Sequence, residues 1–140
     1  MTTAKDSTPD AIHASYQQLL GSVPDMVSQR QRLARATGRI AAVAAIEEFR
    51  DELIHRNPLD RRTQQLVHFA MLIARGEAAP ARLHAAGAVK AGASLTDLQG
   101  VVETAAVVCG MPGAGLAVEV IASLGLIPSM DDTTAGDTER

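Results

Sequence analysis

The hydrophobic positions of this chain recur every three or four residues, and no stretch alternates between apolar and polar residues as a half-buried strand does. A first helix is expected to begin at Thr8-Pro9, where a capping hydroxyl precedes a proline at the first helical position, and to end at Gly21. A second, Arg-rich helix opens at Pro24 and is interrupted near Gly38. The first third of the chain is therefore predicted to be helical.

The middle of the chain carries two stronger helical signals. One helix is expected to stop before Pro58, where basic residues and an asparagine precede the proline. Its apolar positions are Ile40, Val43, Ile46, Phe49 and Leu53. The next runs from Arg61 to Arg75, with Asp60 as its N-cap. This second helix carries apolar residues on most of its faces, which predicts a central position in the fold.

Three more helices complete the pattern. One spans residues 79–91, one is capped by Ser94 and stopped by Gly110, and the last runs from Pro112 to about Leu124. The stripe expected to be buried on the helix after Ser94 is Leu98, Val101, Val102, Ala105, Val108 and Cys109. The sequence thus predicts an all-α fold of six or seven helices. We expect one domain over 9–126, between a disordered N-terminus (1–8) and a disordered acidic tail (127–140).

Composition narrows the class of protein. The 140 residues are 46% hydrophobic but only 2% aromatic, so the core must consist of small aliphatic side chains. A net charge of −3 favours neither nucleic acid nor an anionic membrane as a partner. The N-terminal residues are polar, unlike a signal peptide, and the apolar runs are shorter than a membrane span. We expect a soluble, cytoplasmic protein.

The second half of the chain resembles the carboxymuconolactone decarboxylase family and its relative alkylhydroperoxidase D. The matching stretches are Leu59-Asp60-Arg61-Arg62-Thr63, Leu66-Val67, Ala70-Met71-Leu72, His84, Ala91-Gly92-Ala93-Ser94, Asp97-Leu98 and Cys109-Gly110-Met111-Pro112. The resemblance implies an alkylhydroperoxidase D-like helical subunit that assembles into homotrimers, or into hexamers built from trimers.

The peroxidase branch of that superfamily uses a Cys-x-x-Cys pair four and seven residues before the histidine. Those positions are Pro80 and Glu77 here, and the glutamate of the preceding helix is replaced by Gln65. Thiol chemistry needs an attacking thiolate and a resolving thiol, and Cys109 is the single cysteine of the chain. The sequence therefore predicts that the protein is not a thiol peroxidase and that Cys109 is an inert core residue.

His84 is the strongest candidate for chemistry. It shares a helix face with small residues, which leaves room for a ligand, and a histidine titrates near neutral pH. The alternative is a histidine that only packs between helices. Gln64, Gln65 and His68 form a polar strip on the central helix and are expected to point the same way. That strip is either a hydrogen-bond network in the core or one wall of a pocket.

Other polar residues carry weaker signals. Glu77 precedes a helix and either contacts substrate or simply favours the positive end of that helix. Glu103 is expected at solvent or at an interface, and so are the arginines between Arg30 and Arg39. The four histidines show no metal-binding spacing, so neither a metal nor another cofactor is expected.

These observations lead to two hypotheses for the function. The first is a cofactor-free lyase, resembling the decarboxylases, or an isomerase. It would act on a small carboxylated or enolisable ring or lactone, with His84 and His68 as acid and base and Gln65, Gln64 and Glu77 binding substrate. The second is a non-catalytic member of the same fold that binds a small ligand or serves as a scaffold. Both require the same core, so the helical pattern does not separate them.

Overall fold

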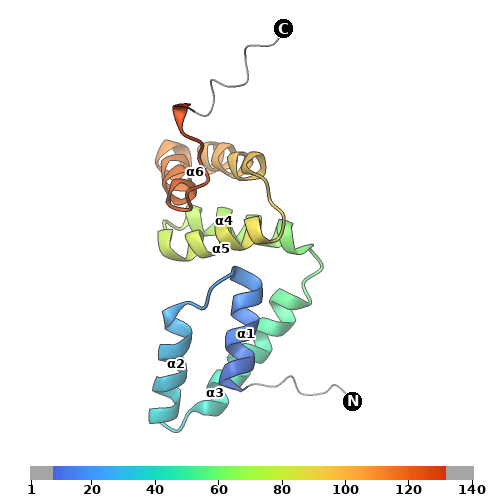
Figure 1. Ribbon diagram of the computed structural model, residues 1–140. Helices are drawn as coiled ribbons and strands as arrows, with labels where there is room; N and C mark the ends of the chain where they lie inside the picture. Colours follow the sequence, from blue (N-terminus) through green and yellow to red (C-terminus); the bar gives the residue numbers. More distant parts are fainter. Residues whose placement is uncertain (1–7, 132–140) are drawn as a thin grey trace.

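The computed structural model describes residues 8–131, and over that range it is all-α, without a strand. Figure 1 shows the helices in chain order. They are α1 (Pro9–Leu20), α2 (Asp25–Ala36), α3 (Ile40–Arg50), a π-helical turn η1 (Asp51–His55), α4 (Arg61–Ala74), α5 (Ala78–Lys90) and α6 (Leu95–Ser123). The all-α prediction is confirmed. The predicted disorder of residues 1–7 and 132–140 falls outside the described residues, and the domain limits 9–126 stay a prediction.

Most helices begin and end where the sequence signals lie. The Thr8 hydroxyl accepts the Ala11 amide at 3.3 Å, and Gly21 ends α1 in the left-handed conformation. Ser94 and Asp97 cap α6 reciprocally, with donor–acceptor distances of 2.8 and 3.0 Å. Because these caps satisfy backbone amides that lack a helical partner, they set the ends of the helices locally.

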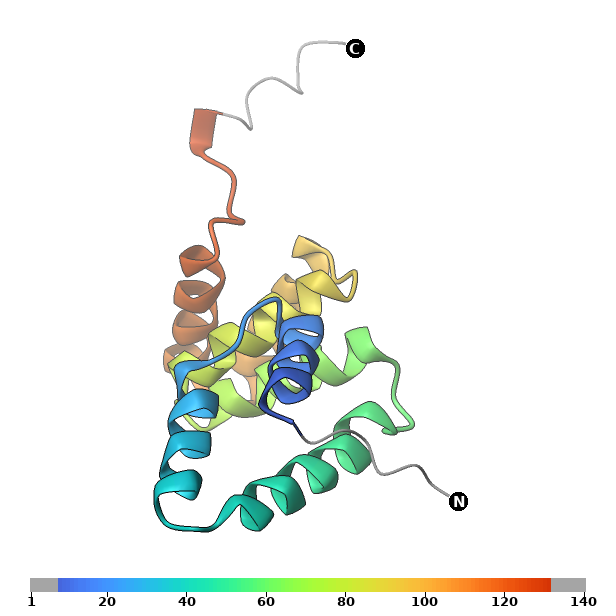
Figure 2. The same ribbon diagram turned by 60° about the horizontal axis from the view of Figure 1, so that its bottom comes forward.

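The helices form layers around α4 and α5. Figures 1 and 2 show this pair in the middle, with α6 against one side and the N-terminal helices on the other. The larger core lies between α4, α5 and α6 and consists mainly of small aliphatic residues. Its buried members are Phe69, Ile73, Ala81, Ala85, Leu98, Val101, Val102, Ala105, Ala114, Ala117, Val120 and Ile121. α4 is therefore central, as predicted.

A second, smaller core joins the N-terminal helices to α5. It contains Ile12, Tyr16, Leu19, Leu20, Val27, Ala34 and Val43, with Leu83 of α5 packed against it. Leu83 immediately precedes His84 in the chain. The N-terminal helices therefore pack beside the segment that carries the candidate histidine.

The apolar face predicted for residues 40–53 exists, but residues 8–131 leave most of it uncovered. Of its five apolar residues only Val43 is buried, while Phe49 is 65% and Leu53 50% exposed. Ile40 and Ile46 are also exposed. The periodicity identified the helix correctly, but periodicity alone does not tell a core face from a face left for another molecule.

Gly110 ends the first of the two helices that make up α6, as predicted. Its backbone (φ 74°, ψ −178°) is non-helical, and the helix resumes in a new direction through Pro112. The expectation that Val108 is buried is wrong, because the kink leaves its side chain 74% exposed. Cys109 is half-buried, and a Cβ on Gly113 would lie 2.5 Å from the Cys109 Cβ. The turn after the kink thus packs closely on Cys109.

By length and apolar composition alone, α6 would suffice to cross a membrane. A core helix of a soluble protein passes the same test. The kink leaves two parts of about 20 Å each at 1.5 Å per residue, shorter than a hydrocarbon core of about 30 Å. The length of α6 therefore does not indicate a membrane span.

Replacing Gly110 by alanine should destabilise the fold. Its φ and ψ lie in a region that is essentially restricted to glycine, so a Cβ there should cost about 1–3 kcal/mol. Gly100→Ala is the matched control, because Gly100 lies in the helical part of α6 and a methyl group added there would have no neighbour within 4 Å. That control should stabilise the protein by roughly 0.5–1 kcal/mol. Urea unfolding of the two variants checks the prediction, and equal shifts would contradict it.

Candidate functional site

Three polar side chains meet where α4 packs on α5. His84 Nδ1 lies 2.8 Å from Gln65 Oε1 and 3.2 Å from His68 Nδ1. The two imidazole rings meet edge to face, with centroids 4.7 Å apart and planes at 83°. Gln65 is fully buried, whereas both histidines are half-buried. The structure therefore brings together His84, His68 and Gln65, three of the residues that the sequence proposed for the site.

The hydrogen bonds fix which nitrogen of His84 carries the proton. An amide oxygen only accepts, so His84 Nδ1–H donates to Gln65 Oε1. In neutral His84 the lone pair then resides on Nε2. His68 Nδ1 lies near enough to accept a share of the same proton. The cluster thus presents His84 Nε2 as a base whose orientation is set by a buried amide.

Burial keeps both histidines neutral at pH 7. Desolvation, followed by the charges of His68 and Arg50, lowers the pKa of His84 from 6.5 to about 4. Desolvation also lowers the pKa of His68, with smaller contributions from Arg50 and Arg61. If both imidazoles took up a proton, their positive charges would repel each other. This repulsion also lowers the pKa of the pair.

Gly87 makes room for the buried amide. A Cβ at this position would lie 2.9 Å from Gln65 Oε1 and 3.2 Å from the Leu19 carbonyl oxygen. Any larger residue would have to displace the amide, the end of α1, or both. The close packing of α1, α4 and α5 thus positions the Gln65–His84 hydrogen bond, and it depends on a glycine one turn after His84.

Gln64 and Glu77 do not join the histidines. Gln64 is buried and donates through Nε2 to the Leu53 carbonyl oxygen at 3.4 Å, so it ties α4 to η1. Gln64 was expected to point the same way as Gln65, and this contact with η1 shows that it does not. Glu77 precedes α5 with its side chain 50% exposed and lies 3.8 Å from Arg75. Seven residues separate it from His84, about 10 Å of helix.

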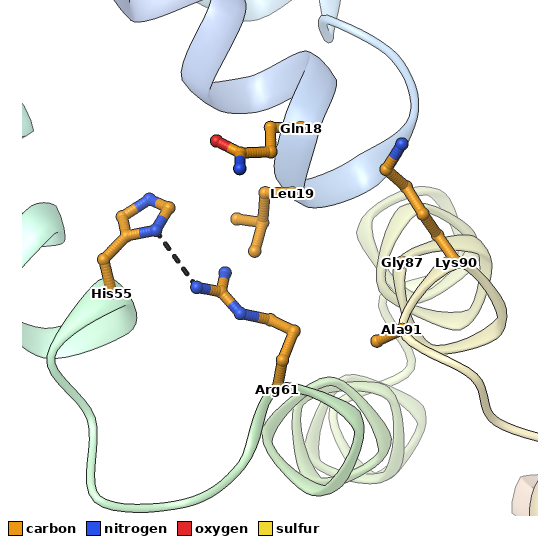
Figure 3. Close-up of a pocket in the computed structure, with 7 residues that line it drawn as sticks. All are labelled: Gln18, Leu19, His55, Arg61, Gly87, Lys90 and Ala91. Carbon is orange, nitrogen blue, oxygen red and sulfur yellow. Dashed lines mark hydrogen bonds between the residues drawn. The ribbon is translucent and has the colours of Figure 1, made fainter.

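A small pocket adjoins the histidines, and no pattern in the sequence indicates it. Its cavity has a volume of about 220 Å³. The residues that line it come from α1, η1, α4 and α5 and its immediate C-terminal end (Figure 3). The lining residues are Gln18, Leu19, His55, Arg61, Gly87, Lys90 and Ala91. From the sequence, Arg61 was noted as the first residue of a helix and for the family resemblance, and His55 as one of the basic residues before Pro58, but Lys90 was given no role. Their convergence depends on how α1 and η1 pack, which no local spacing reveals.

A second polar cluster lies among the N-terminal helices. Glu47 forms ion pairs with Arg30 and Arg50 and accepts the Tyr16 hydroxyl at 3.2 Å. The Arg50 guanidinium stacks 4.0 Å above the Tyr16 ring. Arg30 was expected at solvent or an interface, and its pairing with Glu47 shows a packing role that links α2 to α3. The other arginines up to Arg39 are exposed, and so is Glu103.

Acid should destabilise the protein through His84. Its folded pKa lies below its unfolded value, so between pH 6.5 and about 4 the unfolded chain binds more protons. The free energy of unfolding should therefore fall as the pH drops through this window and change little from this source above it. His84→Asn is the comparison, because an asparagine amide can still donate to Gln65 but does not titrate. Urea unfolding at pH 7 and pH 4.5 should show a smaller loss for the variant, and equal losses would contradict the assignment.

In the part of the chain that the structure describes, no group of three or more His, Cys, Asp or Glu side chains is arranged to hold a metal ion. Comparison with curated proteins and with solved structures gave no match. A family model does match, over residues 41–123, a stretch that runs from α3 to α6 and includes Gln65, His68 and His84. This stretch is more than half of the chain, and the fold is the expected helical one. The protein belongs to the carboxymuconolactone decarboxylase family.

Proposed function

We propose that this protein is a cofactor-free lyase or isomerase that moves a proton at a carbon of a small carboxylated or enolisable substrate. The observation that carries the proposal is the His84 ring, which is held by Gln65 and leaves Nε2 as a base. A histidine that serves packing alone has no need of a buried amide partner that is itself left with an unpaired donor. Gln65 Nε2 is such a donor, since it has no acceptor within residues 8–131.

The chemistry needs one proton-transfer group and a site that excludes water. In an isomerisation, His84 Nε2 takes a proton from a carbon next to a carbonyl and returns it to another carbon of the resulting enolate. In a decarboxylation, the bond to the carboxyl carbon breaks, CO2 leaves, and protonated His84 delivers a proton to the carbanion or enolate. A positioned acid or base contributes about 10²–10⁴-fold to the rate.

The electrostatics favour the base step in the free protein. With a pKa of about 4, His84 is neutral at pH 7 and is ready to accept a proton. The acid step needs a protonated ring, and a nearby substrate anion would raise the pKa of His84 towards neutrality. A carboxylated substrate therefore fits the site better than a neutral one.

The rival function is non-catalytic binding of a small ligand. One observation favours it, because Gln65 stands where a glutamate is expected from the family resemblance, and a neutral amide carries no proton at pH 7. Under this alternative the His84–Gln65 pair orients a ligand without reacting with it.

Measuring the turnover of the His84→Asn variant decides between the catalytic function and the binding function. The assay follows deuterium incorporation and CO2 release by NMR in D2O, over a panel of small carboxylated lactones and unsaturated keto acids. We expect the variant to lose about 10²–10⁴-fold in turnover while it keeps its fold. An active but destabilised variant would refute the catalytic role. Failure of the wild-type protein to turn over any member of the panel would support the binding alternative.

Cys109→Ser serves as the control in that assay. Cys109 is half-buried beside Gly113 and is the single cysteine of the chain, so the substitution should leave turnover unchanged. Neither protein should reduce hydroperoxides with a thiol donor, because a thiol mechanism needs two cysteines. Hydroperoxide reduction that disappears with Cys109→Ser would contradict this part of the proposal.

We also propose that the protein acts as a homotrimer or as a hexamer of trimers. The support is the apolar surface around the kink of α6, where Val107 is 87% and Met111 74% exposed. Exposed apolar side chains that cluster in this way are typical of subunit interfaces.

Light scattering on a sizing column tests this assembly. Each chain has a mass of 14.7 kDa, and we expect the mass of three or six chains at micromolar concentration. Met111→Glu should shift the protein towards the monomer, because burying a carboxylate in an apolar interface is costly. Gln29→Glu adds the same charge at an exposed position of α2 and should leave the mass unchanged. A monomeric wild-type protein would rule the assembly out.

A further inference from the structure

The pocket of Figure 3 is electropositive. Two permanent cations, Arg61 and Lys90, line it together with the amide of Gln18 and the imidazole of His55, and none of its seven lining residues is acidic. Within residues 8–131 neither Arg61 nor Lys90 forms an ion pair with a carboxylate. By contrast, most of the other arginines that have a partner in the described chain form an ion pair with Asp or Glu. Arg62, for example, lies 3.2 Å from Asp97.

Arg61 is held in place by an imidazole rather than by a carboxylate. Its Nη2 donates to His55 Nδ1 at 3.1 Å, because a guanidinium has only donors, and this contact is the dashed line of Figure 3. His55 Nε2 then carries the proton and points it to Ser15 Oγ at 3.2 Å. The arrangement orients the guanidinium towards the cavity without cancelling its charge.

The pocket lies about one helical turn from the histidine pair along both α4 and α5. Arg61 lies one turn before Gln65 on α4, and Gly87 lies one turn after His84 on α5. Gly87 lines the pocket and also borders the Gln65 amide. At 1.5 Å per residue these steps are about 6 Å and about 4.5 Å, which a small organic acid can span.

We propose that this pocket binds the carboxylate of a small organic acid, with Arg61 and Lys90 as its counter-ions and the rest of the ligand directed towards Gln65 and His84. A guanidinium and an ammonium match a carboxylate in charge and in hydrogen-bonding capacity. A cavity of about 220 Å³ is below the roughly 300–1,000 Å³ typical of sites for larger ligands, which suits a small acid. The inference deepens the proposed function by placing the carboxylate of its substrate, but binding itself does not require turnover.

The alternative role for Lys90 is purely structural. Its side chain runs beside the end of α1, where its Cδ would lie 3.7 Å from a Cβ on Gly21. A cation at the C-terminal end of a helix is stabilising. If that were its whole role, Lys90→Gln would lower the Tm and leave ligand binding unaffected, so both quantities need to be measured.

The test is calorimetric titration of the intact 140-residue chain with succinate, and with inorganic phosphate as the second anion. We expect saturable succinate binding that weakens as the salt concentration rises. Arg61→Gln and Lys90→Gln should each weaken it about tenfold or more, the usual effect of losing a charged hydrogen-bond partner. Tighter binding of phosphate than of succinate would show that the site selects another anion and would overturn the assignment to a carboxylate.

Matched controls remove the same charge outside the pocket. Arg62→Gln is the neighbour of Arg61, and Arg82→Gln lies on α5 with its guanidinium bonded to Ser123. Both should bind succinate like the wild-type protein. Equal losses in control and pocket variants, or no saturable binding by the wild-type protein up to about 10 mM, the weakest useful affinity, would overturn the proposal.

Succinate binding and turnover, measured on the same wild-type protein, separate this inference from the proposed function. Succinate binding without turnover of any substrate would uphold the anion site and refute the catalytic function. Turnover that is unaffected by Arg61→Gln and Lys90→Gln would uphold the catalytic function and refute the anion site.

Discussion

The structure depends on how closely α5 can approach its neighbours. The buried face of α5 consists of Ala81, Ala85, Gly87 and Ala88, whose side chains are no larger than a methyl group. That proximity allows one long polar side chain, Gln65, to be fully buried and still reach His84 at 2.8 Å. A buried amide is costly unless it is hydrogen-bonded, so the bond and the packing require each other.

From this contact the electrostatics of the site follow. Burial lowers the pKa of both histidines, and Gln65 holds the proton of His84 on Nδ1, so the opposite nitrogen is left as a base. About one turn away along α4 and α5 lies a pocket with two cations, Arg61 and Lys90, that pair with no carboxylate in the described part of the chain. A ligand anion placed there would bring a negative charge near the histidines and raise their pKa. Binding and proton transfer are thus coupled through charge.

The sequence predicted the helices well because their signals are local. Thr8, Asp60 and Ser94 each cap a helix through a side chain that acts within three residues. The meeting of His84 with Gln65 was also within reach, since small residues around His84 and a polar strip on α4 both indicated a shared interface. Gln64 shows the limit of that reasoning, because helical spacing placed it beside His68 while its contact is with Leu53.

What the sequence could not predict depends on packing between distant segments. The pocket joins Gln18, His55 and Lys90, which lie far apart in the chain, and each has an ordinary explanation in its own helix. The exposure of the apolar faces of α3 and α6 could not be predicted for the same reason. Apolar residues recur with the same spacing on a helix face whether the face is buried in a core or left exposed.

Gln65 is inferred to hold His84 as a neutral base with its lone pair on Nε2. The ¹⁵N chemical shift of each imidazole nitrogen, measured at pH 7 in protein labelled at histidine, tests this inference. We expect a protonated Nδ1 and an unprotonated Nε2 for His84, and a change in that pattern when Gln65 is replaced by leucine. A His84 ring that carries its proton on Nε2, or one that is doubly protonated at pH 7, would contradict it.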